Sequence, residues 1–147
     1  DDLLWLDDWQ ESSNDAFFCK LKLSMDAAST GWVIDNLYSR SIDMIWSEVD
    51  TVIWLDYSFS VNFYRLTKRT LWRILSRERL WKNSNNRENL KMVFSQKSIF
   101  LWMFQKYPQN KKRYLAMMNN PKYQHIRFIH LTSPRKTAAF LKQISGD

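Results

Sequence analysis

The stretch TVIWLD, residues 51–56, decides the expected fold. A short run that is apolar on both faces is typical of a strand in a parallel sheet covered by helices. WVID, residues 32–35, follows Gly31, has the same form and also ends in an acid. HIRFIHL, residues 125–131, is expected to be a third strand. These three runs predict a parallel sheet.

The segment between the first two runs, residues 36–50, has the length of a crossover in a strand–helix–strand unit, about 15 residues. We expect a loop and a short helix there. Helical spacing elsewhere predicts further helices over 14–29, 59–81, 87–106, 111–118 and 134–144. Ser12 or Ser13 is expected to cap the first of these. Pro108 is expected to end the helix over 87–106, and Ser133-Pro134 to begin the last one. Together, the predicted strands and helices indicate a single α/β layered domain, residues 1–147, with a helical insert over 59–118 after the second strand.

The insert carries most of the positive charge. Residues 63–91 hold nine Lys or Arg and two acids. Arg65, Arg69, Arg73 and Arg77 recur every fourth residue, which stacks them on one face of a helix. Guanidinium groups suit phosphate, because they are always charged and bind it in bidentate geometry. The stripe is therefore either an anion site or a solvated helix face.

The two halves of the chain differ in charge. Residues 1–62 hold 12 acids and 3 bases, and residues 63–147 hold 19 bases and 3 acids. Acids beside a basic cleft suit a metal ion and a phosphate that meet between them. Alternatively, two oppositely charged lobes simply attract each other.

Acids at strand ends are candidates for this chemistry, because ligands of open parallel sheets bind at the carboxyl ends of the strands. Asp35 and Asp56 both occupy such positions, and Arg40 follows in the loop after Asp35. Asp35 could hold Mg²⁺ or its waters, and Arg40 a phosphate. An Asp in this place also caps the helix after a strand.

As a set, these motifs resemble small P-loop kinases of the adenylate-kinase-like class. They are most similar to the bacterial group called DNA topology modulation proteins, which are predicted nucleotide kinases. The matching pieces are Trp32–Asp35, Tyr38–Arg40, Asp50–Asp56, the Arg65/Arg69/Arg73 stripe, Trp81 with Asn86–Glu88, Asp1–Trp5 with Trp9, and Ser133–Arg135. The resemblance implies a three-layer parallel sheet flanked by helices, with residues 59–118 as a lid over ATP.

The resemblance also implies a role for individual residues. The catalytic candidates are Asp35, Arg40, Arg73, Arg77 and Arg113, and Asp35 would hold Mg²⁺ through water. The candidates for the phosphate acceptor, a nucleotide or other small molecule, are Asp1, Asp2, Trp5, Tyr38 and Arg87. The candidates for ATP are Arg69, Arg73, Ser133 and Arg135.

One motif of such kinases is missing. A phosphate loop reads G-x-x-x-x-G-K-[ST], and neither Gly31 nor Gly146 begins or ends one. We therefore expect the first strand and the phosphate loop to belong to a segment before Asp1. That strand would lie between the strands over 32–35 and 51–56. The 147 residues alone are expected to bind ATP weakly and to catalyse poorly.

Other features limit the alternatives. Cys19 is the only cysteine, which fits a reducing compartment, and no signal peptide or apolar run of membrane-spanning length is present. We expect a cytoplasmic protein without membrane contact. His125 and His130 have no cysteines beside them, which argues against zinc. The rival function is a nucleic-acid-binding module that contacts phosphates through the basic half.

Overall fold

The computed structural model describes residues 3–35, 38–77, 79–81, 84–88, 93, 95 and 98–146. Its helices are α1 (Asn14–Asp26), α2 (Ile42–Trp46), α3 (Phe59–Ser76), α5 (Ile99–Met118) and α6 (Pro134–Ser145), and its strands are β1 (Thr51–Leu55) and β2 (Arg127–Leu131). Single turns of 3-10 helix lie at Asp7–Trp9, Ser39–Ser41 and Pro121–Tyr123. The protein is thus a mixed α/β structure, as the sequence predicts.

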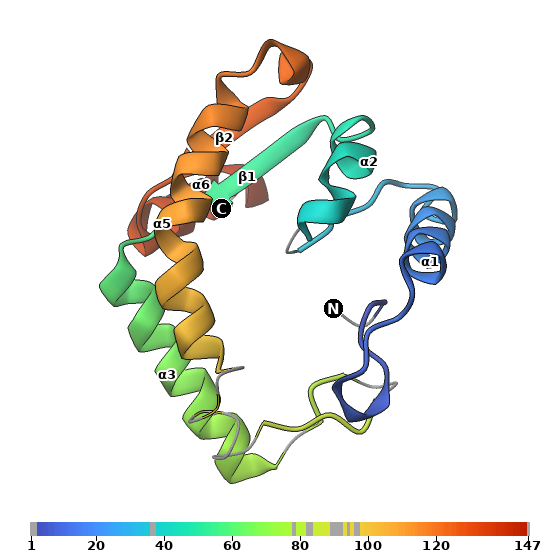
Figure 1. Ribbon diagram of the computed structural model, residues 1–147. Coiled ribbons are helices and arrows are strands. Elements are labelled where there is room, and N and C mark those ends of the chain that lie inside the picture. The colour runs from blue at the N-terminus through green and yellow to red at the C-terminus, as the bar shows by residue number, and fades with distance from the viewer. Residues whose placement is uncertain are drawn as a thin grey trace.

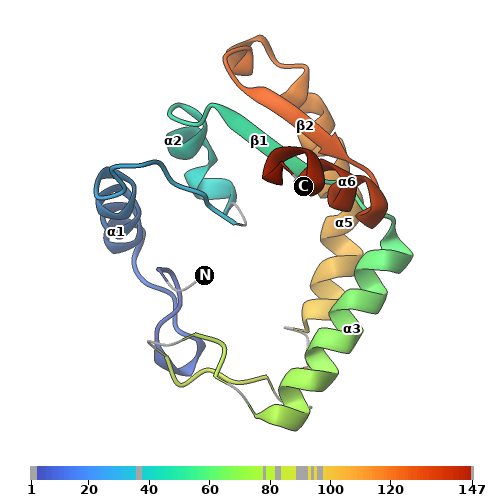
Figure 2. The same ribbon diagram turned by 180° about the vertical axis from the view of Figure 1, so that it is seen from behind.

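The sheet of the described residues has two strands, β1 and β2, which run parallel. Thr51 pairs with Arg127 and Leu55 with Leu131. The backbone N–H of Asp56 donates to the carbonyl of Leu131 at 3.0 Å and extends the pairing by one residue. Helices α5 and α6 lie on opposite faces of this sheet (Figures 1 and 2). The predicted strands over 51–56 and 125–131 are therefore confirmed.

The predicted strand over 32–35 is wrong. Residues 31–35 form no regular structure, and the side chain of Val33 is 97% exposed. A strand forms only when a neighbouring strand accepts and donates its backbone hydrogen bonds. Among the described residues none pairs with this segment, so its apolar run has no sheet to join.

The core lies between α1, α2 and the start of the sheet. Ser13 caps α1 by accepting a hydrogen bond from the N–H of Ala16 at 3.2 Å. This confirms the predicted helix start. The buried side chains of this core are Leu4, Phe17, Leu21, Met25, Ile42, Ile45, Trp46, Tyr123 and Ile126. Trp46 is fully buried and packs edge-on against Tyr123, with the ring centroids 4.8 Å apart.

Helices α3 and α5 form a hairpin held by aromatic contacts. Phe59 packs against Phe104 and Tyr107, and Phe63 against Phe100. Helix α3 ends at Ser76, earlier than predicted, because Arg77 adopts a left-handed conformation with φ 52°. A left-handed residue stops the helix, so Arg77 lies beyond the end of α3 and is not part of the helical stripe that the sequence predicts.

Two helix limits that the sequence predicts in the α5 part of the hairpin are also wrong, namely the helix end before Pro108 and the helix start at Lys111. Helix α5 runs through Pro108 without a break, so the predicted helices over 87–106 and 111–118 share one helix, which begins after the capping residue Ser98. A proline inside a helix removes one backbone hydrogen bond. Ring contacts on both sides of it, at Tyr107 and at Tyr114, hold the helix against α3 and the sheet. Residues 89–92, 94, 96 and 97 lie outside the described residues.

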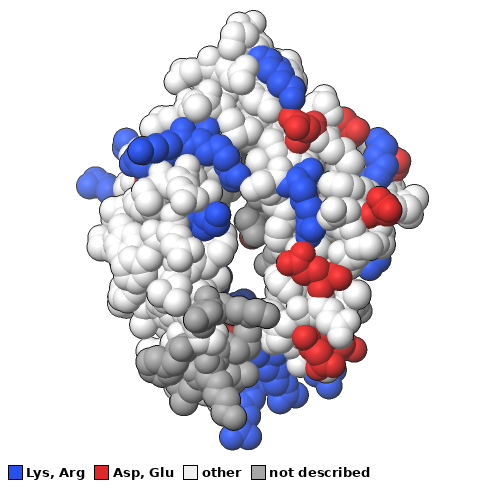
Figure 3. Space-filling view, in the orientation of Figure 1, with Lys and Arg blue, Asp and Glu red and all other residues white. Residues whose placement is uncertain are grey.

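The elements together form a ring (Figures 1 and 2). One arm consists of residues 3–35 and 38–49, with α1 and α2, and the other is the α3–α5 hairpin. The space-filling view is hollowed at its centre (Figure 3). None of the described helices has the length and apolar character needed to span a membrane.

Candidate functional site

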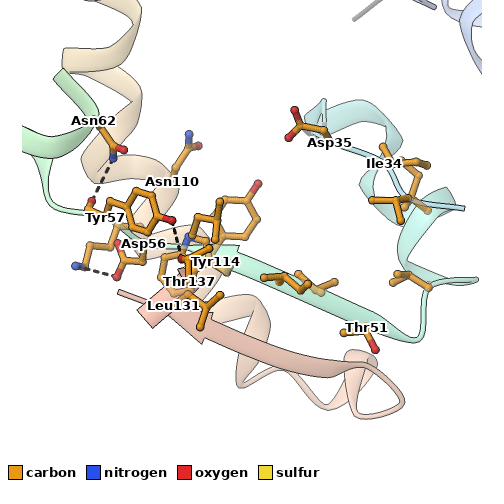
Figure 4. Close-up of a pocket in the computed structure, with 18 of the residues that line it drawn as sticks. Ile34, Asp35, Thr51, Asp56, Tyr57, Asn62, Asn110, Tyr114, Leu131 and Thr137 are labelled. Carbon is orange, nitrogen blue, oxygen red and sulfur yellow. Dashed lines mark hydrogen bonds and ion pairs between the residues drawn. The ribbon is translucent and has the colours of Figure 1, made fainter. Parts of the chain in front are cut away.

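A cavity of about 1000 Å³ lies between segment 31–35 and the edge of β1 that faces away from β2. Residues 51–57 form one wall, and α3, α5 and α6 contribute side chains to the others. Figure 4 shows Asp35 across this cavity from Asp56, Tyr57 and Asn62. The carboxyl end of β1 is polar, whereas the walls near Trp32, Val49 and Val52 are apolar. The cavity therefore combines an apolar part with a polar end.

Asp56 lies at this polar end, where its position after β1 predicts it. Its carboxylate is 6% exposed, and Oδ2 accepts from Lys111 Nζ at 3.1 Å and from His130 Nε2 at 3.0 Å. The indole of Trp54 stacks on the His130 ring with a centroid distance of 4.3 Å. Asp56 thereby connects β1, β2 and α5. Because the carboxylate of Asp56 already binds Lys111 and His130, we assign Asp56 a structural role.

Tyr57 extends the polar end beyond Asp56. Its hydroxyl makes a 2.6 Å hydrogen bond with the Thr137 hydroxyl of α6. Its carbonyl accepts from Asn62 Nδ2 at 3.2 Å and from the Tyr107 hydroxyl at 3.0 Å. These contacts fix the position of the start of α3 relative to the sheet, and hence the positions of the first arginines of α3.

Arg69 is the arginine of α3 that faces the cavity. Together with Asn62, Arg65 and Leu66 it also lines an adjoining hollow of about 230 Å³. Partial desolvation and the neighbouring charge of Arg73 lower the pKa of Arg69 from its usual value. Arg65 lies over the Tyr57 ring, 5.1 Å from its centroid. Two arginines one helical turn apart thus line a hollow large enough for a phosphoryl group.

Asp35 is exposed and faces the cavity from the opposite wall (Figure 4). Within the described residues no group of three or more His, Cys, Asp and Glu side chains could hold a metal ion. Mg²⁺ in phosphate chemistry is often held by one or two carboxylates, with waters and substrate phosphates as the other ligands. Asp35 fits the protein's share of such a site as a single carboxylate.

The other predicted catalytic arginines are engaged elsewhere. Arg40 donates to Asn14 Oδ1 at 2.7 Å and to Glu11 Oε2 at 3.1 Å, so it ties its own loop to the start of α1. Arg73 pairs with Glu88 at 3.0 Å. Arg113 donates to the hydroxyl of Ser39 at 2.7 Å. Arg77 is exposed at the end of α3. None of these four lines the cavity.

The predicted acceptor-binding and ATP-binding residues are also dispersed. Trp5 stacks on Trp81, and Tyr38 packs edge-on against Phe17, where burial raises the pKa of its hydroxyl. Ser133 caps α6 by accepting from the N–H of Lys136 at 3.3 Å. Arg87 and Arg135 are exposed. Asp1 and Asp2 lie outside the described residues. Of the predicted site residues, Asp35 and Arg69 are the ones that line the cavity.

Seven residues of α5 line the cavity, and none of them was predicted as a site residue from the sequence. Four of the seven carry a polar group, namely Tyr107, Asn110, Lys111 and Tyr114. Their spacing of three, four and seven residues places them on one helix face. That signal is present in the sequence, but it becomes visible only if the helix is continued through Pro108.

Comparison with models of known protein families, with curated proteins and with solved structures gave no match to this chain.

Proposed function

We propose that this chain is part of an ATP-dependent phosphotransferase of the small P-loop kinase type, acting on a nucleotide or another small phosphate acceptor. The observation that carries the proposal is the cavity along β1, where Asp35 and Arg69 line the same space. Phosphoryl transfer needs mainly positioning and stabilisation of charge, which a carboxylate for Mg²⁺ and guanidinium groups for phosphate supply.

The same cavity supports a proposal for the finer fold. In the described residues β1 pairs with β2 alone, so its other edge is unpaired and faces the cavity. Ile53 and Leu55 are both 48% exposed there, and segment 31–35 lies on the far side. A parallel strand inserted between them would pair with both and bury these side chains. In the proposed three-layer kinase fold that strand leads into the phosphate loop, and α3 with α5 forms the lid.

In this scheme each residue has a limited role. Arg69, with Arg65 beside it, neutralises phosphate charge at the polar end. Asp35 holds Mg²⁺ through a water molecule, and the ion would supply further neutralisation of the phosphates. Asn62 and Asn110 offer amide groups at the same end of the cavity. Arg40, Arg73 and Arg113 stabilise the walls and do not contact the ligand.

Calorimetry with Mg²⁺–ATP tests the proposal. The 147-residue chain should bind weakly, and Arg69→Met should weaken binding at least fivefold. Arg135→Met is the matched control, because Arg135 was also predicted to bind ATP but is exposed on α6 and does not line the cavity. Equal effects of the two substitutions would refute the proposed phosphate site.

A second experiment tests the fold. A peptide with an apolar strand followed by a G-x-x-x-x-G-K-[ST] loop, added in trans or fused before Asp1, should strengthen ATP binding at least tenfold. A control peptide keeps the strand but replaces the loop lysine by alanine. If the complete peptide changes neither ATP affinity nor the exposure of Ile53 and Leu55, the proposed fold is wrong.

The second candidate, a nucleic-acid-binding module, rests on the basic half of the chain. It requires Arg65, Arg69, Lys111, Lys112 and Arg113 to form one open stripe. Lys111 is instead paired with Asp56, and Arg113 is half-buried and bonded to Ser39. Binding of a DNA duplex that weakens steeply with salt and does not respond to ATP would favour this candidate over the kinase.

A further inference from the structure

We propose that the contact between residues 5–9 and residues 81, 85 and 86, which we name the clasp, opens and closes the ring around the cavity. This opening would act as a gate to the cavity whichever ligand the cavity binds. The proposal is based on the hydrogen bonds of the clasp, on the strained backbone of the clasp and on the position of the clasp in the ring.

Side-chain amides make the polar half of the clasp. Asn86 is 2% exposed, accepts from the N–H of Trp9 at 2.8 Å and donates to the carbonyl of Leu6 at 2.8 Å. Asn85 accepts from the N–H of Asp8 at 2.9 Å and donates through its own backbone N–H to Asp7 Oδ1 at 2.7 Å. A further hydrogen bond of 3.0 Å joins Asn85 Nδ2 to Asp8 Oδ1. Most of these contacts satisfy backbone groups, so they require the two segments to stay in one register.

Three tryptophans make the apolar half. Trp5 and Trp81 stack with ring centroids 6.1 Å apart and an interplanar angle of 10°. Trp9 meets both edge-on, with its centroid 5.8 Å from Trp5 and 5.9 Å from Trp81. The three centroids therefore form a nearly equilateral triangle, too tight for a ligand to enter between the rings. The tryptophans bind one another, which identifies the cluster as a contact between segments.

The backbone of the clasp is strained. Asp8 and Trp9 have φ values of 55° and 59°, in the left-handed region. This conformation is unfavourable for a bulky residue such as tryptophan, and it persists only when surrounding contacts enforce it. Asn85 and Asn86 enforce it here, because they accept hydrogen bonds from these two backbone N–H groups. Release of the clasp would relieve the strain as it breaks the hydrogen bonds, so the two states differ less in free energy than the contacts alone suggest.

The position of the clasp in the ring explains why its opening and closing would control access to the cavity. The described residues join the two arms of the ring at two places. One is the core end, where Arg113 bonds Ser39 and Trp46 stacks with Tyr114. The other is the clasp, at the far end of the ring (Figure 1). With the clasp released, the arms remain joined at the core end and can separate at the other, which widens access to the cavity.

Amide exchange tests whether the clasp opens on its own. In the native protein, the amides of Asp8 and Trp9 should exchange at least tenfold faster than the amides of β1. Asn86→Ala should speed both exchange rates at least tenfold more. Asn120→Ala is the matched control, since Asn120 also accepts a backbone hydrogen bond, from Lys122 at 3.0 Å, but lies outside the clasp. If Asp8 and Trp9 exchange only at the rate of global unfolding, the clasp does not open separately.

A reversible lock tests the gate. Asp8→Cys and Asn85→Cys, in a Cys19→Ser background, place two thiols where the native side chains touch. The oxidised protein should take up the apolar dye 8-anilinonaphthalene-1-sulfonate at least fivefold more slowly than the reduced protein. Spin labels at Ser24→Cys and Lys68→Cys, again with Cys19→Ser, should show an added population of longer distances between the arms when Asn86→Ala is introduced. Equal dye uptake with and without the crosslink, or an unchanged distance distribution, would overturn the proposal.

Discussion

Replacement of Asp56 by asparagine should destabilise the fold through the contacts at the end of β1. The carboxylate is 6% exposed and accepts from both Lys111 and His130 on one oxygen. The substituted side chain would keep an acceptor oxygen and nearly the same size but lose the charge. A hydrogen bond to a charged group contributes about 1.5–3 kcal/mol, against about 0.5–1.5 kcal/mol for a neutral one.

The expected loss follows from these two contacts. The Lys111 side chain is 48% exposed, so solvent screens its share, and we discount it to a few tenths of a kcal/mol. Asp56→Asn should therefore lower the free energy of unfolding by about 1–2 kcal/mol. For a chain of this size that corresponds to a decrease in Tm of about 3 °C per kcal/mol. Lys111→Met should cost about 0.5 kcal/mol or less.

Urea denaturation followed by tryptophan fluorescence measures both losses, and the double variant measures their coupling. Near-UV circular dichroism should change for Asp56→Asn, because Trp54 stacks on the His130 ring that Asp56 orients. The reasoning is refuted if Asp56→Asn is no more destabilising than Lys111→Met. It is also refuted if the double variant loses the full sum of the two single losses.

Three further predictions concern residues with defined side-chain partners. The hydrogen bond and charge of Lys122 lower the pKa of the Asp43 carboxyl. This carboxylate therefore stabilises the fold above its usual pKa of about 3.9, and the contribution is lost as the pH falls through the lowered value. An NMR titration should show the Asp43 pKa rising in Lys122→Met. Arg40→Lys should lower the free energy of unfolding by about 0.5–1 kcal/mol, because lysine lacks the two terminal nitrogens with which Arg40 bonds Asn14 and Glu11. The substitution should leave ATP affinity unchanged, and a loss of affinity would indicate that Arg40 belongs to the ligand site. Ser133→Ala should lower the free energy of unfolding by about 1 kcal/mol, because α6 loses its cap. Calorimetry should find an ATP affinity within about twofold of the native protein. A larger change would indicate that Ser133 contacts the ligand.

Local signals in the sequence predict much of the fold. The apolar runs at 51–56 and 125–131 form the two parallel strands, and serine caps mark the beginnings of α1 and α6. The run at 32–35 carries the same local signal but forms no strand, because pairing depends on a neighbour that the run itself does not encode. Pro108 carries a strong local signal against a helix, which aromatic contacts with α3 and the sheet outweigh.

The site was less predictable than the fold. Asp35, Asp56 and Arg69 line one cavity. The sequence pointed to Asp35 and Asp56 because both follow apolar runs, although the run before Asp35 forms no strand, and to Arg69 through the helical spacing of the arginines. It could not separate Arg69 from Arg40, Arg73 and Arg113, since a partner such as Glu11, Glu88 or Ser39 is known only once the chain has folded. The clasp had no local signal at all, because its hydrogen-bonded partners are 77–80 positions apart in the sequence.

These long separations bear on how the chain acquires its structure. Asp8 meets Asn85, 77 residues later, and Thr51 pairs with Arg127, so two large loops that overlap in sequence must both close. Contacts between distant positions slow folding, because chain entropy is lost before the contacts form. During synthesis, Asp8 and Trp9 cannot adopt their final conformation until Asn85 and Asn86 have left the ribosome. Residues 5–9 are therefore available to other binding partners, chaperones included, while the intervening residues are being made.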